Sequence, residues 1–326
     1  MIAAWMLYSV VLGSLVLVGA IPLDRLIRDG GGETRRVWAG ALCFAVLLPL
    51  VGVLLKDSAA AVEIGDTLVV ASPTAGLVMS GVETLAGLDW PLLSLWAGLS
   101  TLLASVLVGG LGATVVRARG WREAEVDGHS VLVSREVGPA VVGIWPGRIV
   151  LPQWALSLDA RQRAMMLRHE REHVRAGDPG LMLFVALLLV AFPWNPALWY
   201  MATRVRLAVE VDCDRRVLSG QAPDVRGYAE LLLSVGARQS RLAYGVGFSL
   251  GRPFLEQRID CMTSPRCRGS RAHALLVAAG LVGVLAAAWA LPQPVRAAKI
   301  GNAVPMCVSD TAELTAHLLA GLDRSS

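Results

Sequence analysis

Four long apolar runs constrain the fold of this chain more than any other feature. Residues 1–23 contain no charged side chain, and similar runs cover 37–55, 91–116 and 273–291. Each is close to the ~20 apolar residues that a helix needs to cross a bilayer. The first run lacks a basic start and a small-residue cleavage site, so we expect a retained helix. A mean hydropathy of +0.56 agrees with a multi-pass membrane protein that has four transmembrane helices.

Loop charges predict how these helices are oriented. Residues 24–36 hold four arginines, whereas residues 56–90 hold one lysine against five acidic residues. Positively charged loops stay on the cytoplasmic side of a membrane. We therefore expect a protein of the inner (cytoplasmic) membrane, with residues 117–271 on its cytoplasmic side and both termini outside. The arginines flank the apolar runs and form no basic face with aromatics between them, which argues against direct nucleic-acid binding.

The motif H-E-x-x-H at residues 169–173 carries the most specific chemistry. On a helix His169 and His173 point the same way, so they form a pair of zinc ligands, with Glu170 placed to activate a water molecule. Ser157 and Asp159 are candidate N-caps of this helix, and residues 177–179 (Gly-Asp-Pro) are a stop signal. The alternative is an exposed helix whose motif residues form salt bridges with neighbouring arginines.

A second pair of acidic residues lies about forty positions further along. Catalytic zinc sites keep three protein ligands, and Glu210 is the candidate for the third. Asp214, one turn later, is the candidate carboxylate that accepts the other ring N–H of a histidine ligand. The alternative is a solvated acidic face balanced by arginines. We expect the helix to continue past Asp214 through residues 228–233.

Two further features frame the predicted metal helix. Runs at 131–133, 140–144 and 148–151 predict short strands, whose edge would either add a substrate peptide as a strand or only support the helix. Residues 180–202 are apolar but interrupted at 193–196. A full span there would put Glu210 and His169 on opposite sides of the membrane. We therefore expect a hairpin, buried in the protein or dipping into the membrane.

The last part of the chain, residues 292–326, is predicted to be a short external tail. A capping box at residues 309–313 predicts a short helix, and this length is too small for a ligand-binding domain with its own core. Cys307 stands alone in the tail and would suit a disulfide between the chains of a homodimer.

Taken together, these motifs resemble those of the BlaR1/MecR1-like membrane metallopeptidases (family M56), over roughly residues 138–258. The matching motifs are Val142-Gly-Ile-Trp-Pro146, Ile149-Val-Leu-Pro152, His169-Glu-Arg-Glu-His173, Gly177-Asp178, Phe192-Pro-Trp-Asn-Pro196 and Glu210-Val-Asp-Cys-Asp214.

The resemblance implies a gluzincin-type zinc peptidase, mostly α-helical with a small β-sheet. It implies His169, His173 and Glu210 as Zn²⁺ ligands and Glu170 as the catalytic residue. Its domain plan would be three membrane helices in residues 1–116, a cytoplasmic peptidase domain in 117–271, a fourth membrane helix in 272–291 and the tail in 292–326. Family members of known role respond to an external signal, bring about cleavage of a cytoplasmic repressor and often cleave themselves. The antibiotic receptors carry a large external sensor that this tail cannot match, so β-lactam sensing is not carried over.

Three functions remain open from the sequence. They are a regulatory protease that acts on a cytoplasmic transcriptional repressor or on itself, a membrane-protein quality-control peptidase, and a non-catalytic membrane scaffold with a structural zinc. A complete ligand set with a base beside it disfavours the scaffold, because structural sites usually close all four positions. For the oxyanion of the reaction, Tyr228, Arg204 and Arg206 are candidate donors by proximity in sequence.

Overall fold

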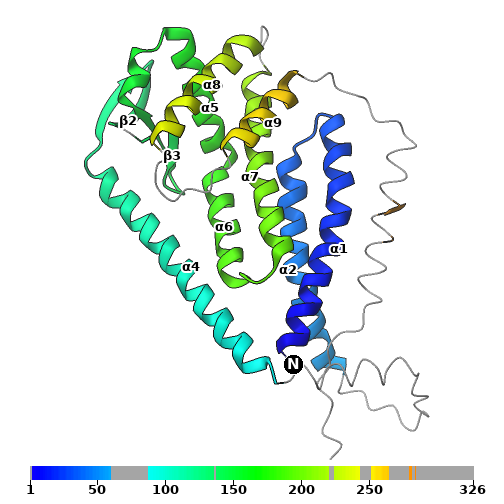
Figure 1. Ribbon diagram of the computed structural model, residues 1–326. Helices are drawn as coiled ribbons and strands as arrows, with labels where there is room; N and C mark the ends of the chain where they lie inside the picture. Colours follow the sequence, from blue (N-terminus) through cyan, green and yellow to red (C-terminus); the bar gives the residue numbers. More distant parts are fainter. Residues whose placement is uncertain are drawn as a thin grey trace, which may run out of the picture. The chain divides into compact units, whose positions relative to one another are not determined.

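The structure, a computed structural model, describes residues 2–59, 87–135, 137–219, 224–242 and 251–263, with 279–280 and 283. The predicted tail at 292–326, with its capping box and Cys307, lies outside the described residues, as does nearly all of the predicted fourth span. The described chain is mostly helical (Figure 1). Its elements are α1 (Ile2–Asp29), α2 (Thr34–Ala59), α4 (Asp89–Ala118), β1 (Arg122–Val126), β2 (His129–Ser134), β3 (Ala140–Val142), β4 (Arg148–Pro152), the 3-10 helix η1 (Gln153–Ser157), α5 (Ala160–Ala176), α6 (Asp178–Ala191), α7 (Pro196–Val217), α8 (Val225–Leu242) and α9 (Gly251–Thr263).

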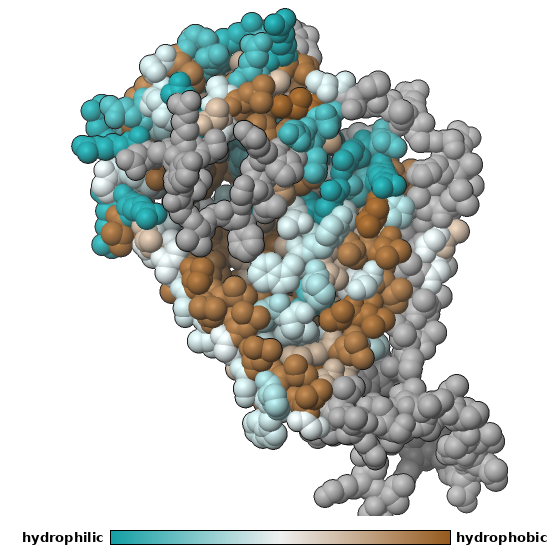
Figure 2. Space-filling model, viewed as in Figure 1, coloured by the Kyte–Doolittle hydropathy of each residue, from teal (hydrophilic) through white to brown (hydrophobic). Residues whose placement is uncertain are grey.

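Three helices among the described residues are long and apolar enough to cross a membrane. They are α1, the Thr34–Val51 part of α2, and α4, and they coincide with the first three predicted spans. None of the residues of α4 is buried, and Leu95 and Val108 are 66% and 68% exposed. Figure 2 shows apolar side chains gathered over the part with the long helices and hydrophilic ones over the part with the sheet. Such an apolar surface suits contact with lipid.

A four-stranded sheet packs beside α5, the helix that carries the H-E-x-x-H motif. Its strand order is β1-β2-β4-β3, with β2 and β4 parallel and the other two pairs antiparallel. The three predicted strands are confirmed as β2, β3 and β4, and Val150 and Leu151 of β4 are fully buried. Strand β1 was missed because its sequence, Arg-Glu-Ala-Glu-Val, is charged and mostly exposed. Strand β3 forms one edge of the sheet.

Residues 178–217 fold as two helices, α6 and α7, joined by a short turn. Asn195 caps α7, because its side chain accepts a hydrogen bond from the Ala197 N–H at 3.0 Å. At the turn, the Asn195 amide donates to the Ser9 carbonyl at 3.1 Å, and the Trp96 indole N–H donates to the Ala191 carbonyl at 3.0 Å. The turn therefore contacts α1 and α4 near their N-terminal ends.

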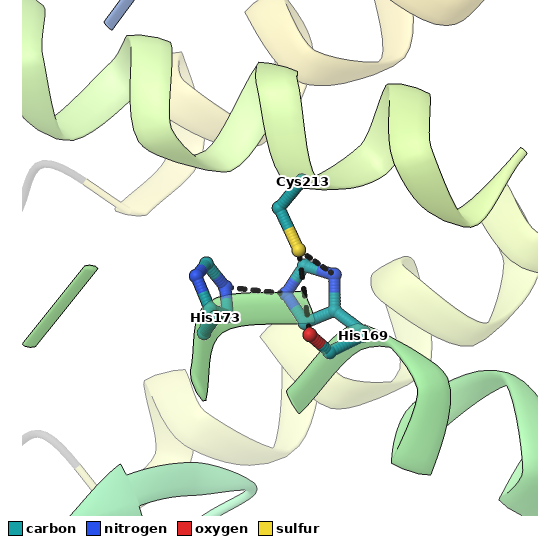
Figure 3. Close-up of side chains that lie close together, drawn as sticks. All are labelled: His169, His173 and Cys213. Carbon is teal, nitrogen blue, oxygen red and sulfur yellow. Dashed lines mark hydrogen bonds between the residues drawn. The ribbon is translucent and has the colours of Figure 1, made fainter. Parts of the chain in front are cut away.

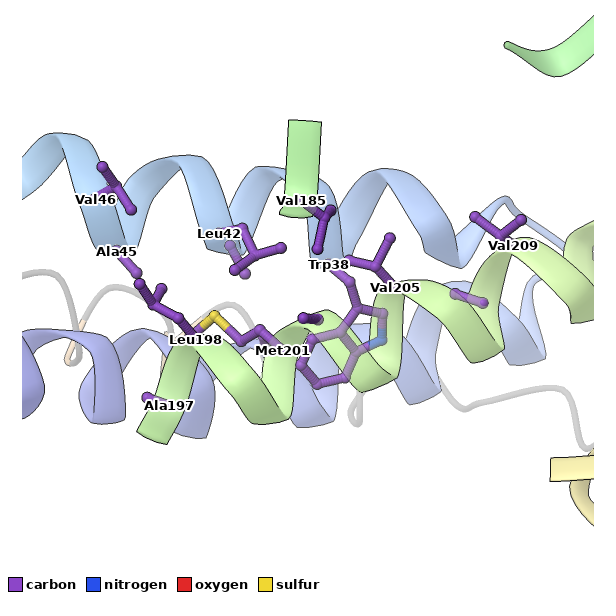
Figure 4. Packing of buried hydrophobic residues seen from close by; sticks show 14 residues of the cluster. Trp38, Leu42, Ala45, Val46, Val185, Ala197, Leu198, Met201, Val205 and Val209 are labelled. Carbon is purple, nitrogen blue, oxygen red and sulfur yellow. The ribbon is translucent and has the colours of Figure 1, made fainter. Parts of the chain in front are cut away.

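The two helices of this hairpin bury their apolar faces against α1 and α2. Trp38, Leu42 and Met201 are at most 1% exposed in this core (Figure 4). A buried polar group lies in the same interface: Asp24 of α1 accepts hydrogen bonds from the Trp38 indole N–H at 2.9 Å and from Arg204 at 3.3 Å. The hairpin is thus joined to α1 and α2 by both apolar packing and buried hydrogen bonds.

One predicted helix is interrupted. The helix that begins at Pro196 ends at Val217, and α8 starts anew at Val225. The linking sequence contains Gly220 and Pro223, both of which disfavour a helix interior. This break allows α8 to turn back, so that Leu231 and Leu232 pack in one core with Met166 and Leu167 of α5.

Candidate metal centre

Helix α5 presents the two histidines of the motif on one face. Of the two predicted N-cap candidates, Asp159 is confirmed, because its Oδ1 accepts a hydrogen bond from the Gln162 N–H at 2.8 Å. Ser157 is instead the last residue of η1. The helix ends at Gly177, whose φ of 69° is in the left-handed region that glycine adopts readily. The Nε2 atoms of His169 and His173 lie 3.1 Å apart (Figure 3). Both rings therefore direct the same nitrogen toward one point.

Glu210 of α7 brings its carboxylate to the same point. Its Oε2 lies 3.7 Å from His169 Nε2, and its Oε1 lies 3.9 Å from His173 Nε2. For zinc–nitrogen bonds of 2.0–2.1 Å in a tetrahedron, neighbouring ligand atoms would be about 3.3 Å apart. The three separations lie close to this value, so the donor set fits a zinc ion with small side-chain movements.

Cys213 is the other candidate ligand near the histidines. The ligand atoms of His169, His173 and Cys213 all lie within 4.8 Å of one another. However, Cys213 Sγ lies 3.3 Å from His169 Nδ1, the ring nitrogen that does not face His173 (Figure 3). Its thiol also donates to the His169 carbonyl at 3.4 Å, and burial raises the pKa of this thiol far above its ordinary value. The geometry favours Glu210 over Cys213 as the third ligand.

The ring of His169 is held from behind by Tyr228 of α8. The Tyr228 hydroxyl donates to Asp214 Oδ1 at 2.7 Å and lies 2.8 Å from His169 Nδ1. Burial raises the pKa of Tyr228, so the phenol stays neutral and its oxygen can accept the Nδ1 proton of His169. Asp214 itself is 3.5 Å from this nitrogen. The partner predicted for a histidine ligand is therefore adjacent, with Tyr228 in closer contact.

The ring of His173 is held by a different carboxylate. Its Nδ1 lies 2.7 Å from Asp178 Oδ2, and Asp178 is 3% exposed. When His173 Nδ1–H donates a hydrogen bond to this carboxylate, the Nε2 atom carries the lone pair, which faces the proposed position of the metal. From the sequence, Asp178 was identified as part of the helix stop and of the Gly177-Asp178 motif, with no role at the metal assigned to it. The available signal for its role was its place directly after Gly177, the residue that ends the helix with the two histidines.

Arg258 of α9 is a second residue that the sequence analysis missed. Its guanidinium donates to Asp214 through Nε at 2.8 Å and through Nη2 at 2.7 Å. Its Nη1 lies 2.9 Å from Glu210 Oε2. Burial would raise the pKa of Glu210, but His169 and the Arg258 charge outweigh it, so the net shift is downward and Glu210 remains a carboxylate. No sequence pattern links positions 210 and 258.

Glu170 lies on the wall of the cavity that holds these groups. It is 5% exposed, and burial raises the pKa of its carboxyl above the ordinary value. A raised pKa suits a group that takes up and releases a proton near neutral pH. The cavity has a volume of about 510 Å³. Its other walls are Pro139, Ala140 and Val141 at the β3 edge, Arg206, and the apolar side chains of Met166, Met182, Val209, Leu231, Leu232 and Val235.

The three candidate oxyanion donors lie in different places. Arg204 bonds Asp24 and stacks over the Trp38 ring at 5.2 Å, so it belongs to the helix interface. Tyr228 lines the cavity, but its hydroxyl is engaged with Asp214. Arg206 lines the cavity as well. Of the three, Arg206 is the donor that the structure leaves available to a substrate.

Comparison with known proteins shows which proteins this segment of the chain is similar to. Residues 124–261 match the family described as BlaR1 peptidase M56, and this stretch contains all of the residues just described around the two histidines. With its three apolar helices and this match, the chain is similar to membrane peptidases of the BlaR1 type. More particularly, the matched segment resembles BlaR1: it is 27% identical over 138 residues to the Regulatory protein BlaR1 of Bacillus licheniformis. That match covers 40% of this chain and 23% of the relative, so the chain spans under a quarter of that protein.

Proposed function

We propose that this chain is a membrane-bound zinc endopeptidase in which His169, His173 and Glu210 hold Zn²⁺ and Glu170 is the catalytic residue. The observation that carries the proposal is the convergence of the two histidine Nε2 atoms, 3.1 Å apart, with the Glu210 carboxylate within 3.9 Å of both. The match of this segment to a peptidase family supports peptide hydrolysis as the reaction.

The residues around the cavity divide the chemistry between them. Zinc would supply a Lewis acid that polarises the scissile carbonyl and acidifies a water molecule. Glu170 accepts the proton of the attacking water and returns it to the leaving amine. Asp214 and Asp178 are carboxylates that fix the two histidine rings, the former through Tyr228. Arg206 is our candidate donor to the developing oxyanion.

The edge of the sheet offers a way to hold an extended peptide beside these groups. Strand β3 is an edge strand, and its residues Ala140 and Val141 line the same cavity as Glu170. A peptide added to this edge as a further strand would bring one of its carbonyls to the metal point while its side chains contact apolar walls. This geometry supports cleavage within a chain and not only at its ends.

A regulatory role is the function we favour for the whole chain. The relative is named a regulatory protein, and we propose here that the substrate is a cytoplasmic transcriptional repressor or the chain itself. We place residues 117–271 as the peptidase domain on the cytoplasmic side of the inner membrane, with the hairpin near residues 180–202 dipping into the membrane or buried in the protein. Its packing against α1 and α2 supports that placement. The alternative is a membrane-protein quality-control peptidase.

The experiment that tests this proposal compares the wild-type chain with Glu170→Gln in membranes loaded with zinc. Self-cleavage, and cleavage of a repressor encoded by a neighbouring gene, are followed on gels while zinc content is measured. We expect fragments only from the wild type, with equal zinc in both proteins. Equal fragments from both would remove Glu170 from its role. Bound zinc with no fragment from either would favour a structural zinc in a membrane scaffold.

A further inference from the structure

The turn between α1 and α2 lies against the C-terminal end of the metal helix. Arg35, the second residue of α2, has a side chain that is only 13% exposed. Its Nη1 donates to Asp178 Oδ1 at 2.7 Å and to the Ala176 carbonyl at 3.3 Å. Asp178 uses its other oxygen to hold His173 Nδ1 at 2.7 Å. A membrane helix therefore reaches a candidate metal ligand through one carboxylate.

Helix α7 fixes the same turn from the other side. The backbone N–H of Arg35 donates to Asp212 Oδ2 at 2.9 Å, and Asp212 is 1% exposed. Arg215 donates to the Gly31 carbonyl at 3.0 Å and also to the Gly32 carbonyl. Glu210 lies on this same stretch of α7. The turn is thus bonded to the two helices that supply the proposed ligands.

Arg35 is the cation in closest contact with Asp178. Arg216 is the next one, with Nη2 at 3.8 Å from Asp178 Oδ2, too long for a hydrogen bond. Without Arg35, Asp178 Oδ1 loses its 2.7 Å hydrogen bond, and the buried carboxylate is free to turn toward another donor. Such a turn would alter the hydrogen bond that orients His173.

We propose that Arg35 is a positioning residue for the metal site, which through Asp178 links the position of the α1–α2 turn to the orientation of His173. This inference rests on the proposed zinc site. Through this contact, a displacement of the α1–α2 turn would change the orientation of His173, one of the proposed zinc ligands. A signal received by α1 and α2 would act on the peptidase by this contact.

The test measures zinc affinity of the full chain in detergent by competition with a chelator, together with the visible spectrum of the Co²⁺-loaded protein. Removal of an outer partner of a metal ligand typically weakens binding about 10–100-fold. We expect Arg35→Ala to weaken zinc by about tenfold, at the lower end because Arg35 acts through Asp178. Arg35→Lys should recover part of this loss. Arg36→Ala is the matched control, since the Arg36 side chain is 79% exposed and pairs with Glu33.

A double variant distinguishes positioning from general damage. If Arg35 acts through Asp178, then Arg35→Ala combined with Asp178→Asn should bind zinc no more weakly than Asp178→Asn alone. Additive losses would overturn the proposal, as would wild-type affinity and an unchanged Co²⁺ spectrum in Arg35→Ala. Should Arg35→Ala not accumulate in membranes, Arg35→Lys decides: a shifted spectrum and weaker binding support the proposal, and wild-type values overturn it.

Arg215→Ala tests the link to the turn separately. This change frees the Gly31 and Gly32 carbonyls and removes the Arg215 partner of Asp212, which lies 3.3 Å away. Both effects loosen the turn and neither touches Asp178, so the proposal predicts a measurable loss of zinc affinity. Unchanged affinity would reduce Arg35 to a local partner of Asp178 and overturn the link. These outcomes stay distinct from failure of the proposed function, which would appear as absence of zinc in the wild type or as cleavage by Glu170→Gln.

Discussion

The two histidines of the candidate metal centre are equivalent in the motif but are held by different parts of the molecule. His169 is oriented by Tyr228, with Asp214 and Arg258 behind it, all from the helices α7, α8 and α9. His173 is oriented by Asp178, which in turn is bonded to Arg35 of a membrane helix. Among the described residues, the partners that orient His169 thus come from α7, α8 and α9, whereas the chain of partners behind His173 extends to Arg35 of the apolar helix α2.

The largest effect should come from removal of either ligand. His169→Ala and His173→Ala should each abolish cleavage and weaken zinc by more than the roughly 100-fold upper bound for outer partners. Zinc content by mass spectrometry of the purified variants is the measurement. If either variant keeps full zinc content and activity, the two histidines do not form the metal centre, and the His169 and His173 sides have no separate roles in it.

Arg258 should matter most for the folded state of the His169 side. Its loss leaves Asp214, 1% exposed, without its cation, and breaking a buried ion pair costs about 3–5 kcal/mol. We expect Arg258→Ala to lower the thermal unfolding temperature of the detergent-solubilised protein strongly, while Arg226→Ala, whose side chain is 91% exposed, leaves it unchanged. Equal unfolding temperatures would show that Arg258 does not stabilise this side.

The two orienting partners allow a direct comparison of the two sides. Asp178→Asn removes a charge from His173 and should weaken zinc within the range of about 10–100-fold, whereas Tyr228→Phe removes a neutral hydroxyl and should cost nearer to tenfold. Only the Asp178 effect should be coupled to Arg35. Coupling of Arg35→Ala to Tyr228→Phe, measured as non-additive zinc affinities, would contradict the division of the site.

Cys213 should have the smallest effect. If its thiol only packs behind His169, Cys213→Ala should change zinc affinity by less than about tenfold, below the range for hydrogen-bonding partners. Chelator competition measures this directly. A loss as large as that of His173→Ala would make the thiol a ligand in place of Glu210.

Local patterns predicted much of the fold, and long-range contacts account for what they missed. The caps of α5, the three strands and the turn between α6 and α7 follow from residues close together in sequence, such as Asp159 and Gly177. Strand β1 is charged and gains its place only by pairing with β2, which no hydrophobic pattern signals. The break after Val217 is a different case, because Gly220 and Pro223 stand in the sequence between α7 and α8 and both residue types disfavour a helix interior, so a local signal was present there.

In the candidate metal centre, too, the sequence predicted residues that lie close together in the chain and missed distant ones. Spacings of four residues placed His169 with His173 and Glu210 with Asp214 on shared helix faces, as the structure has them. Arg258 and Arg35 reach the site from 44 and 143 positions away from the carboxylates they bond, so no spacing rule relates them. Asp178 is only five positions from His173, but its neighbours Gly177 and Pro179 suggested a purely structural role as a helix stop.

X-ray absorption of the zinc-loaded full chain tests the central claim most directly. The account predicts one zinc per chain with nitrogen and oxygen neighbours at roughly 2.0–2.2 Å, two of them imidazoles, and no sulfur. A sulfur neighbour near about 2.3 Å would instead place Cys213 on the metal, and a protein that binds no zinc would contradict the proposed centre itself.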